Sequence, residues 1–266
     1  MSRIRALATS LLIPVLAACA SGGQAPASAQ GAGSAAAVTD AESLVRAMHH
    51  RYAGSWYRTL SFKQTVKRTN PDGTHPPTEV WTEFAEFPGK LRIEFGEPAV
   101  GSGAIYSGDS VFVFRDGALA RSAAQRNPLL LLGFDVHVRP PEQTLRLLRE
   151  EKFDLGRFHE GTWQGRPVYV VGAEEGDLKS TQFWVDRERL LFVRLLQPSP
   201  QDSTKTSDIR FDAYRPIGGG WIAPEVVFLL DGREVMREDY FDMEVDVPLA
   251  PGLFDPVRWS NAGKQR

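Results

Sequence analysis

Cys19 is the residue of this sequence whose surroundings point most directly to a chemical reaction. It is the only cysteine in 266 residues, so its thiol has no partner for an intramolecular disulfide. Arg3 and Arg5 give the chain a basic start, and Ala6 to Ala18 are almost wholly apolar or small. This run is shorter than the roughly 20 apolar residues that span a bilayer, and it has the length of a secretory signal core. We therefore expect residues 1–18 to be an export signal.

The tetrad Leu16-Ala17-Ala18-Cys19 resembles the lipobox of bacterial lipoproteins. The resemblance implies cleavage before Cys19, a diacylglycerol on its sulfur and a third acyl chain, such as palmitate, on its new amino group. Because each buried methylene contributes about 0.8 kcal/mol, three chains would anchor the protein permanently. In a Gram-negative cell, Ala20 after the cysteine indicates the periplasmic face of the outer membrane. The alternative is an ordinary signal peptide with a chance cysteine.

The sequence offers little for catalysis or metal binding. We expect His49, His50 and His75 at the surface, and His137 and His159 have no acidic or cysteine neighbour at the spacing of metal ligands. Serine-hydrolase elbows, zinc-protease motifs and phosphate loops do not occur. We therefore predict a protein that is not an enzyme and has no cofactor or metal. A periplasmic hydrolase assembled from distant residues is the least favoured alternative.

Composition bounds the partners and the domain organisation. The formal net charge is −2, from 31 basic and 33 acidic residues, which argues against a nucleic-acid binder. Residues 19–38 are mainly Ala, Gly, Ser and Gln and predict a flexible tether from the membrane anchor. We expect one domain over residues 39–258 and a polar tail over 259–266.

Most of the predicted domain alternates with a period of two, which is typical of strands. Thr39, followed by Glu42, first predicts a capped helix to about Tyr52. We then expect about eleven strands, at residues 60–66, 78–87, 90–95, 104–107, 110–115, 167–172, 181–186, 190–196, 207–214, 221–230 and 234–243. Short links predict antiparallel neighbours, and so many strands predict a curled sheet.

A helical segment interrupts the strands in the middle of the chain. Asn127 and Pro128 resemble a helix start, and Leu129 to Leu132 with Phe134 leave that helix without a polar face. A second helix is expected to open at Arg139-Pro140-Pro141-Glu142, with Leu145, Leu148 and Arg149 at helical spacing. Because an all-apolar segment must be covered, we expect it to lie against the concave face of the sheet.

Several strands carry large apolar side chains on both faces. Phe112 and Phe114 alternate with valines, and Trp184 lies between Phe183 and Val185. A packed core on one side, with scattered surface residues on the other, would explain this pattern. A curled sheet enclosing an apolar ligand cavity would explain it equally well.

The order of short motifs resembles the LolA/LolB-like lipoprotein carriers and receptors of the bacterial outer membrane. The motifs are Leu60-Ser61-Phe62-Lys63-Gln64, Phe87-Pro88-Gly89-Lys90-Leu91-Arg92, Ile105 to Phe114, Asn127 to Leu132, Phe183-Trp184-Val185-Asp186, Ile209-Arg210-Phe211 and Leu253-Phe254-Asp255-Pro256. The resemblance implies a mainly β (α+β) fold: a single curled, unclosed antiparallel sheet, or half-barrel, with a helical lid. Cys19 makes the chain more similar to the anchored receptor than to the soluble carrier.

The resemblance also implies a function and a site. Acyl chains of lipoproteins or phospholipids would lie in a hydrophobic cavity and be sorted or transferred to the outer membrane, with a periplasmic carrier protein as a partner. The expected lid residues are Leu129, Leu130, Leu131, Leu132 and Phe134. The expected cavity residues are Phe62, Trp81, Arg92, Phe112, Phe114, Trp184 and Phe228. Arg92 would tie the sheet to the lid or form an outward salt bridge. The alternative function is a regulatory or scaffold lipoprotein that binds a protein partner or senses lipids with the same fold.

Overall fold

The computed structural model describes residues 37–259. Cys19, the signal expected at 1–18, the tether up to residue 36 and the tail from residue 260 lie outside the described residues. Trp259, expected to begin the polar tail, is buried and is part of the packed domain. The described elements all belong to one compact unit, Ala35–Arg266.

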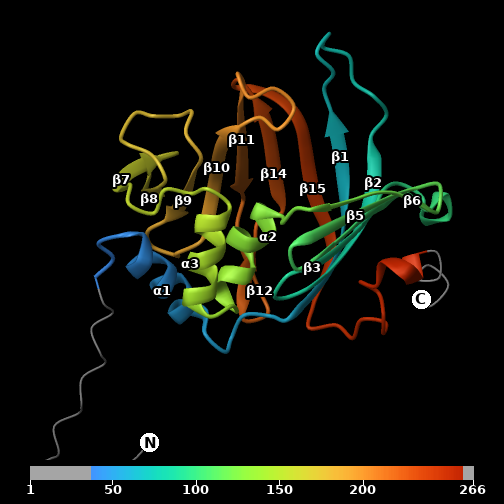
Figure 1. Cartoon of the computed structure of the whole chain (residues 1–266), viewed down its shortest axis with the longest axis horizontal. Helices are drawn as coiled ribbons and strands as arrows, with labels where there is room; N and C mark the ends of the chain where they lie inside the picture. The colour runs from blue at the N-terminus through green and yellow to red at the C-terminus, as the bar shows by residue number, and fades with distance from the viewer. Residues whose placement is uncertain (1–36, 260–266) are drawn as a thin grey trace, which may run out of the picture. The chain divides into compact units, whose positions relative to one another are not determined.

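One antiparallel sheet of 13 strands organises the described residues (Figure 1). Its strand order is β6-β5-β4-β3-β2-β1-β15-β14-β11-β10-β9-β8-β7, and a small hairpin, β12-β13, stands apart. The edge strands β6 and β7 do not pair with each other, so the sheet is curved but not closed into a barrel. The predicted fold class, a single unclosed antiparallel sheet with helices, is confirmed.

The strands are β1 (Thr59–Arg68), β2 (Glu79–Glu86), β3 (Lys90–Glu94), β4 (Gly103–Ser107), β5 (Ser110–Arg115), β6 (Ala118–Ala124), β7 (Phe158–Trp163), β8 (Arg166–Val171), β9 (Gln182–Asp186), β10 (Phe192–Pro198), β11 (Thr206–Asp212), β12 (Arg215–Ile217), β13 (Gly220–Ile222), β14 (Glu225–Leu230) and β15 (Arg233–Val245). The helices are α1 (Ala41–Tyr52), α2 (Pro128–Gly133) and α3 (Pro141–Glu150), with 3-10 turns η1 (Pro98–Val100) and η2 (Asp135–His137).

Both edge strands escape the sequence prediction. β6 has the sequence Ala-Leu-Ala-Arg-Ser-Ala-Ala, which lacks the β-branched and aromatic residues that are typical of a strand. Its side chains are almost wholly exposed. β7 contains Gly161 and buries none of its side chains fully. Tertiary pairing to β5 and to β8, not local preference, fixes these two strands.

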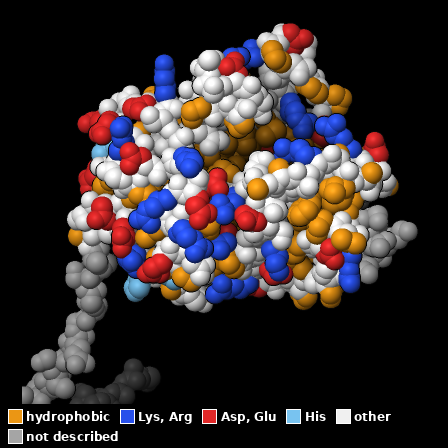
Figure 2. All heavy atoms as spheres, in the orientation of Figure 1, with side chains coloured by type: hydrophobic (Ala, Val, Ile, Leu, Met, Phe, Trp, Pro, Cys, Tyr) orange, Lys and Arg blue, Asp and Glu red, His pale blue; other side chains and the backbone are white. Residues whose placement is uncertain are grey.

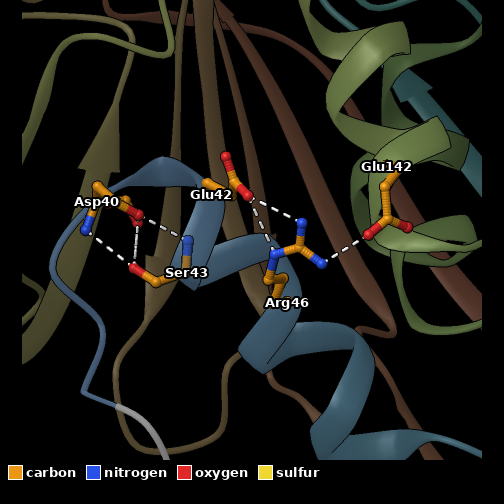
Figure 3. A network of polar contacts seen from close by, with 5 residues as sticks. All are labelled: Asp40, Glu42, Ser43, Arg46 and Glu142. Atoms are coloured by element: carbon orange, nitrogen blue, oxygen red, sulfur yellow. Dashed lines mark hydrogen bonds and ion pairs between the residues drawn. The ribbon is translucent and has the colours of Figure 1, made fainter.

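The start of α1 differs by one residue from the prediction (Figure 3). Asp40, not Thr39, is the N-cap, because its carboxylate accepts a hydrogen bond of 2.7 Å from the Ser43 amide. The Ser43 hydroxyl in turn accepts from the Asp40 amide at 3.0 Å, which completes the capping box. Glu42 is therefore free to pair with Arg46, one turn further along the helix.

Arg46 links α1 to α3 at the surface (Figure 3). Its guanidinium lies 2.8 Å from Glu42 and 2.7 Å from Glu142. Exposed pairs of this kind contribute only about 0.2–1 kcal/mol each. The buried contacts of Leu44 and Leu148 within one apolar cluster hold the two helices more strongly.

Residues 128–150, which we name the crossover segment, connect the two edges of the sheet. They contain α2, η2 and α3 and run from β6 at one edge to β7 at the other. The helices lie on one side of the curved sheet (Figure 1). Leu131 and Leu132 pack there with α1 and with strand residues such as Phe192. The predicted helical cover of the sheet is confirmed.

Candidate functional site

A cavity of about 400 Å³ lies between the concave face of the sheet and α2. Its strand walls are largely apolar and include Leu60, Ile93, Ile209 and Phe228. Figure 2 shows a hollow lined by hydrophobic side chains at this place, above α2 in the orientation of Figure 1. The volume and lining are typical of pockets for small apolar ligands.

The predicted lid residues divide between the cavity and the core. Leu129, Leu130 and Phe134 line the cavity. Leu131 and Leu132 are buried on the other side of α2. This division explains why a helix of six residues without a polar face is tolerated, because one side of α2 faces the cavity and the other side packs into the core.

Asn127 fixes the start of α2, as predicted. Its side-chain oxygen accepts hydrogen bonds from the amides of Leu129, at 2.9 Å, and Leu130, at 3.2 Å. Asn127 and Pro128 also line the cavity. The N-cap is therefore placed at the rim, where its hydrogen bonds determine how firmly α2 lies over the cavity.

Asp135 fixes the far end of α2 to the sheet. Its carboxylate accepts a hydrogen bond of 3.0 Å from the Gly89 amide and forms an ion pair of 3.0 Å with Arg139. Burial raises the pKa of Asp135, and Arg139 partly opposes that rise. The crossover segment is thus attached at η2, next to the turn between β2 and β3.

His137 strengthens the same attachment. The imidazole is buried, stacks on Trp56 at 3.9 Å between ring centroids and meets Tyr52 edge-on at 4.9 Å. Burial lowers its pKa to about 3, so the ring is neutral near pH 7. A neutral histidine among aromatic rings acts as a packing residue here.

The predicted cavity residues are only partly brought together. Phe62 and Phe228 line the cavity. Trp81 lies on the same face of β2 as the lining residue Glu83, but it packs against Phe95 at 4.4 Å. Its position further along the strand keeps it out of the cavity lining.

Four predicted cavity residues lie on the opposite face of the sheet. Phe114 stacks on Trp259 at 4.4 Å, and Phe112 packs against the same cluster. Trp184 meets Trp163 edge-on at 5.5 Å. The physical reason is the period of two, since a one-residue error in facing moves a side chain to the other face.

Arg92, the fourth of these residues, does not tie the sheet to the lid; it forms an ion pair with Glu94 on the face opposite to the cavity, as its alternative role predicted, although both side chains are buried. Its guanidinium is buried, donates to Glu94 at 3.0 Å and lies 3.9 Å from the Trp259 ring centroid. It also donates to the carbonyl of Leu253 at 3.2 Å. Arg92 therefore ties the sheet to the C-terminal segment, while Arg139 pairs with Asp135 within the crossover segment.

Sequence reasoning missed a polar group in the cavity. Glu83, Glu238 and Tyr240 line it from β2 and β15. Burial, reinforced by the charge of Glu238, raises the pKa of Glu83 well above its usual value. Burial raises the pKa of Glu238 to about 7, while the nearby Tyr240 hydroxyl and Gln64 amide oppose the rise. In the sequence, Glu83 stands two positions from each of the apolar residues Trp81 and Ala85 and therefore shares their face of β2. This pattern was the one signal that could have revealed Glu83 as a cavity residue.

Within residues 37–259, no helix is both long and apolar enough to cross a membrane. The same residues hold no cluster of three or more His, Cys, Asp or Glu side chains suited to a metal ion.

Three solved structures resemble this chain at low sequence identity. A DUF1329 family protein from Desulfovibrio piger has 15% identity and a TM-score of 0.56, over 82% of this chain and 97% of its own. A putative outer membrane lipoprotein-sorting protein domain from Vibrio parahaemolyticus has 12% identity and a TM-score of 0.55, over 82% and 97%. A LolA superfamily protein from Nitrosomonas europaea has 14% identity and a TM-score of 0.50, over 82% and 98%.

These likenesses show the fold, an unclosed antiparallel sheet that the chain shares with the three structures, as the order of motifs predicted. No protein-family model and no curated protein sequence matches the chain.

Proposed function

We propose that this protein binds acyl chains of lipids or lipoproteins in the cavity under α2 and helps to sort or transfer them in the bacterial envelope. The observation that carries the proposal is the cavity of about 400 Å³, lined by strand residues and by Leu129 and Leu130 of α2. Of the structures with the same fold, one is a putative outer membrane lipoprotein-sorting protein domain and another is a LolA superfamily protein, which supports this choice of cargo.

Apolar burial supplies the affinity in this proposal. Each methylene removed from water contributes about 0.8 kcal/mol, so ten buried methylenes would contribute about 8 kcal/mol before the entropy cost of binding. Such binding needs an apolar wall but no reacting group. The protein in this account therefore acts without catalysis and without a cofactor.

Residues 128–134 act as the lid in this account. Leu129, Leu130 and Phe134 contact the cargo, while Asp135 and His137 hold the following turn in place. Opening then requires α2 to move about its fixed end near η2. Asn127 lies at the moving end, beside the β6 edge of the sheet.

The membrane anchor completes the proposal. Lipidation of Cys19 would attach the domain to the periplasmic face of the outer membrane through residues 19–38. A tether of this length and composition would let the domain meet a periplasmic carrier protein and return its cargo to the membrane.

A second candidate is a regulatory or scaffold lipoprotein that binds a protein partner. The observation that favours it is the edge strand β6, which is almost wholly exposed and presents Leu119 with 54% of its surface accessible. An unpaired edge can accept a strand from another chain. The open cavity favours the lipid-binding role over this one.

Native mass spectrometry with lipid extraction tests the proposal. The chain Ala35–Arg266, purified from its host without detergent, should carry copurifying acylated molecules. Ile93→Trp, which fills the cavity, should lose them, whereas Phe112→Trp on the opposite face should keep them. A clean apo mass, together with failure to take up a fluorescent acyl chain, would contradict the proposal.

A further inference from the structure

The floor of the cavity carries a polar group on three neighbouring strands. Gln64 on β1 pairs with Trp81 of β2 on one side and with Tyr240 of β15 on the other. Glu83 lies opposite Phe62, and Glu238 lies opposite Val66, so the two carboxyl groups flank Gln64 diagonally. Both glutamates line the cavity.

This polar group is buried and poorly satisfied. Gln64 is 0% exposed, Glu83 6% and Glu238 8%. Neither amide atom of Gln64 has a hydrogen-bond partner within 3.5 Å in the described part of the chain, although the amide lies close enough to Glu238 to lower the pKa of that carboxyl. Glu238 receives a long hydrogen bond, 3.4 Å, from the Tyr240 hydroxyl. An unsatisfied buried amide destabilises a folded chain, so this arrangement does not serve stability by itself.

No cation among residues 37–259 forms an ion pair with either glutamate. Arg68, whose charge lowers the pKa of Glu238, bonds instead to Glu79 at 2.7 Å and lies over the Trp81 ring. Arg126, the cation in the cavity lining, pairs with Glu150 and Glu151. Tyr106 of β4 also faces Glu83 and is neutral, since burial raises its pKa. Two buried carboxyl groups without a counter-ion are uncommon in a stable core and point to a ligand.

We infer that the floor recognises a protonated amine on an amphiphile whose alkyl or acyl chain lies along the apolar wall. An ammonium group offers three N–H donors and no acceptor. The floor offers two matching acceptors, the carboxylates of Glu83 and Glu238, and the buried amide of Gln64 lies between them. The ionised glutamates would repel a fatty carboxylate or a phosphate in the same place, and a hydroxyl would donate only once.

This inference rests on the proposed function, because the chain of the amine needs the cavity. It adds selectivity for charge to a site that would otherwise select only for apolar length. It also implies proton release, since a bound ammonium favours the ionised form of both glutamates. Binding of the amine should therefore strengthen as the pH rises from 6 to 8.

Calorimetric titration with three ligands of equal chain length tests the inference. The probes are decylamine, decanol and decanoate, each below its critical micelle concentration, added to the chain Ala35–Arg266 at pH 6 and pH 8. We expect decylamine to bind one-to-one at pH 8, at least tenfold more tightly than decanol, and decanoate to bind most weakly. Glu238→Gln and Glu83→Gln should each reduce this preference to about threefold or less.

Glu86→Gln is the matched control, because Glu86 lies on the same strand as Glu83 and pairs with Lys90 away from the cavity. It should retain the full preference for the amine. Equal affinities of decylamine and decanol, unchanged in Glu238→Gln, would overturn the inference while leaving acyl binding intact. Failure of all three ligands to bind would instead contradict the proposed function.

Discussion

Glu83 and Glu238 face one apolar cavity from the strands on either side of β1, with the buried Gln64 between them. The two glutamates are 155 positions apart in the sequence. It places titratable groups where a sheet of this kind would otherwise be apolar. The pair consequently links ligand selection, pH and stability at one place.

The first prediction concerns stability against pH. The pKa of Glu238 rises from 4.5 to about 7 on folding, so the folded chain holds a proton that the unfolded chain has released. The difference in pKa stabilises the folded chain, and this stabilisation is fully present below pH 4.5 and is lost as the pH rises through 7. One pKa unit corresponds to about 1.4 kcal/mol, which gives a loss of roughly 3 kcal/mol by pH 8. Urea unfolding at pH 5 and pH 8 measures it.

Glu238→Gln should reduce the dependence of stability on pH but keep the part due to Glu83, whose pKa burial also raises, whereas Glu86→Gln should retain the full dependence. His137 contributes an opposite slope, because its folded pKa is lowered to about 3 and stability falls as the pH drops below 6.5. That contribution is common to all three proteins and cancels in the comparison. An equal slope in Glu238→Gln and the unaltered chain would show that Glu238 ionises freely in the folded state.

The second prediction concerns cavity volume. Ala85 is buried and lines the cavity, so Ala85→Phe should fill part of it and weaken acyl-chain binding at least tenfold. Phe84→Trp adds bulk one residue away on the other face and should leave affinity unchanged. A fluorescent acyl chain titrated into both variants gives the comparison. Equal affinities would place the ligand elsewhere.

The third prediction concerns the lid. Asn127→Ala removes the hydrogen bonds to the amides of Leu129 and Leu130, which should cost about 1 kcal/mol at the start of α2. A looser α2 should release bound acyl chains about fivefold faster in stopped-flow displacement. Asn127→Ser keeps a capping oxygen and should release at nearly the original rate. Identical release from Asn127→Ala would mean that α2 does not gate the cavity.

The fourth prediction separates the two faces of the sheet. Trp259→Ala removes the ring that stacks on Phe114 and lies under Arg92, so it should lower the free energy of unfolding by about 3–5 kcal/mol. Ligand affinity per folded molecule should not change, because this cluster lies on the face opposite to the cavity. A parallel loss of affinity would show that the C-terminal segment takes part in binding.

The sequence predicted the architecture because local patterns carry it. Gly108-Asp109 marked the turn between β4 and β5, and Asn127-Pro128 marked the start of α2, since turn and cap residues act through their immediate neighbours. The strands that it missed, such as β6, have no local signal and form through pairing alone.

The cavity was harder to predict because the facing of each strand depends on register. Phe62 and Phe228 lie on the lining, while Phe112 and Trp184 have the same character and lie on the other face. A strand that is apolar on both faces does not reveal which face is concave. Glu83 was overlooked because an acidic residue in a strand is usually placed toward solvent.

Photocrosslinking tests the central claim, acyl binding in the cavity, most directly. The probe is a long-chain alcohol with a diazirine in mid-chain, bound to the chain Ala35–Arg266 and mapped by peptide mass spectrometry. We predict crosslinks to β1, β14 and α2 at lining residues such as Phe62, Phe228 and Leu130, which excess unlabelled alcohol suppresses. Crosslinks concentrated on Phe112 or Trp184 at the opposite face, or crosslinks that excess alcohol does not suppress, would contradict the account.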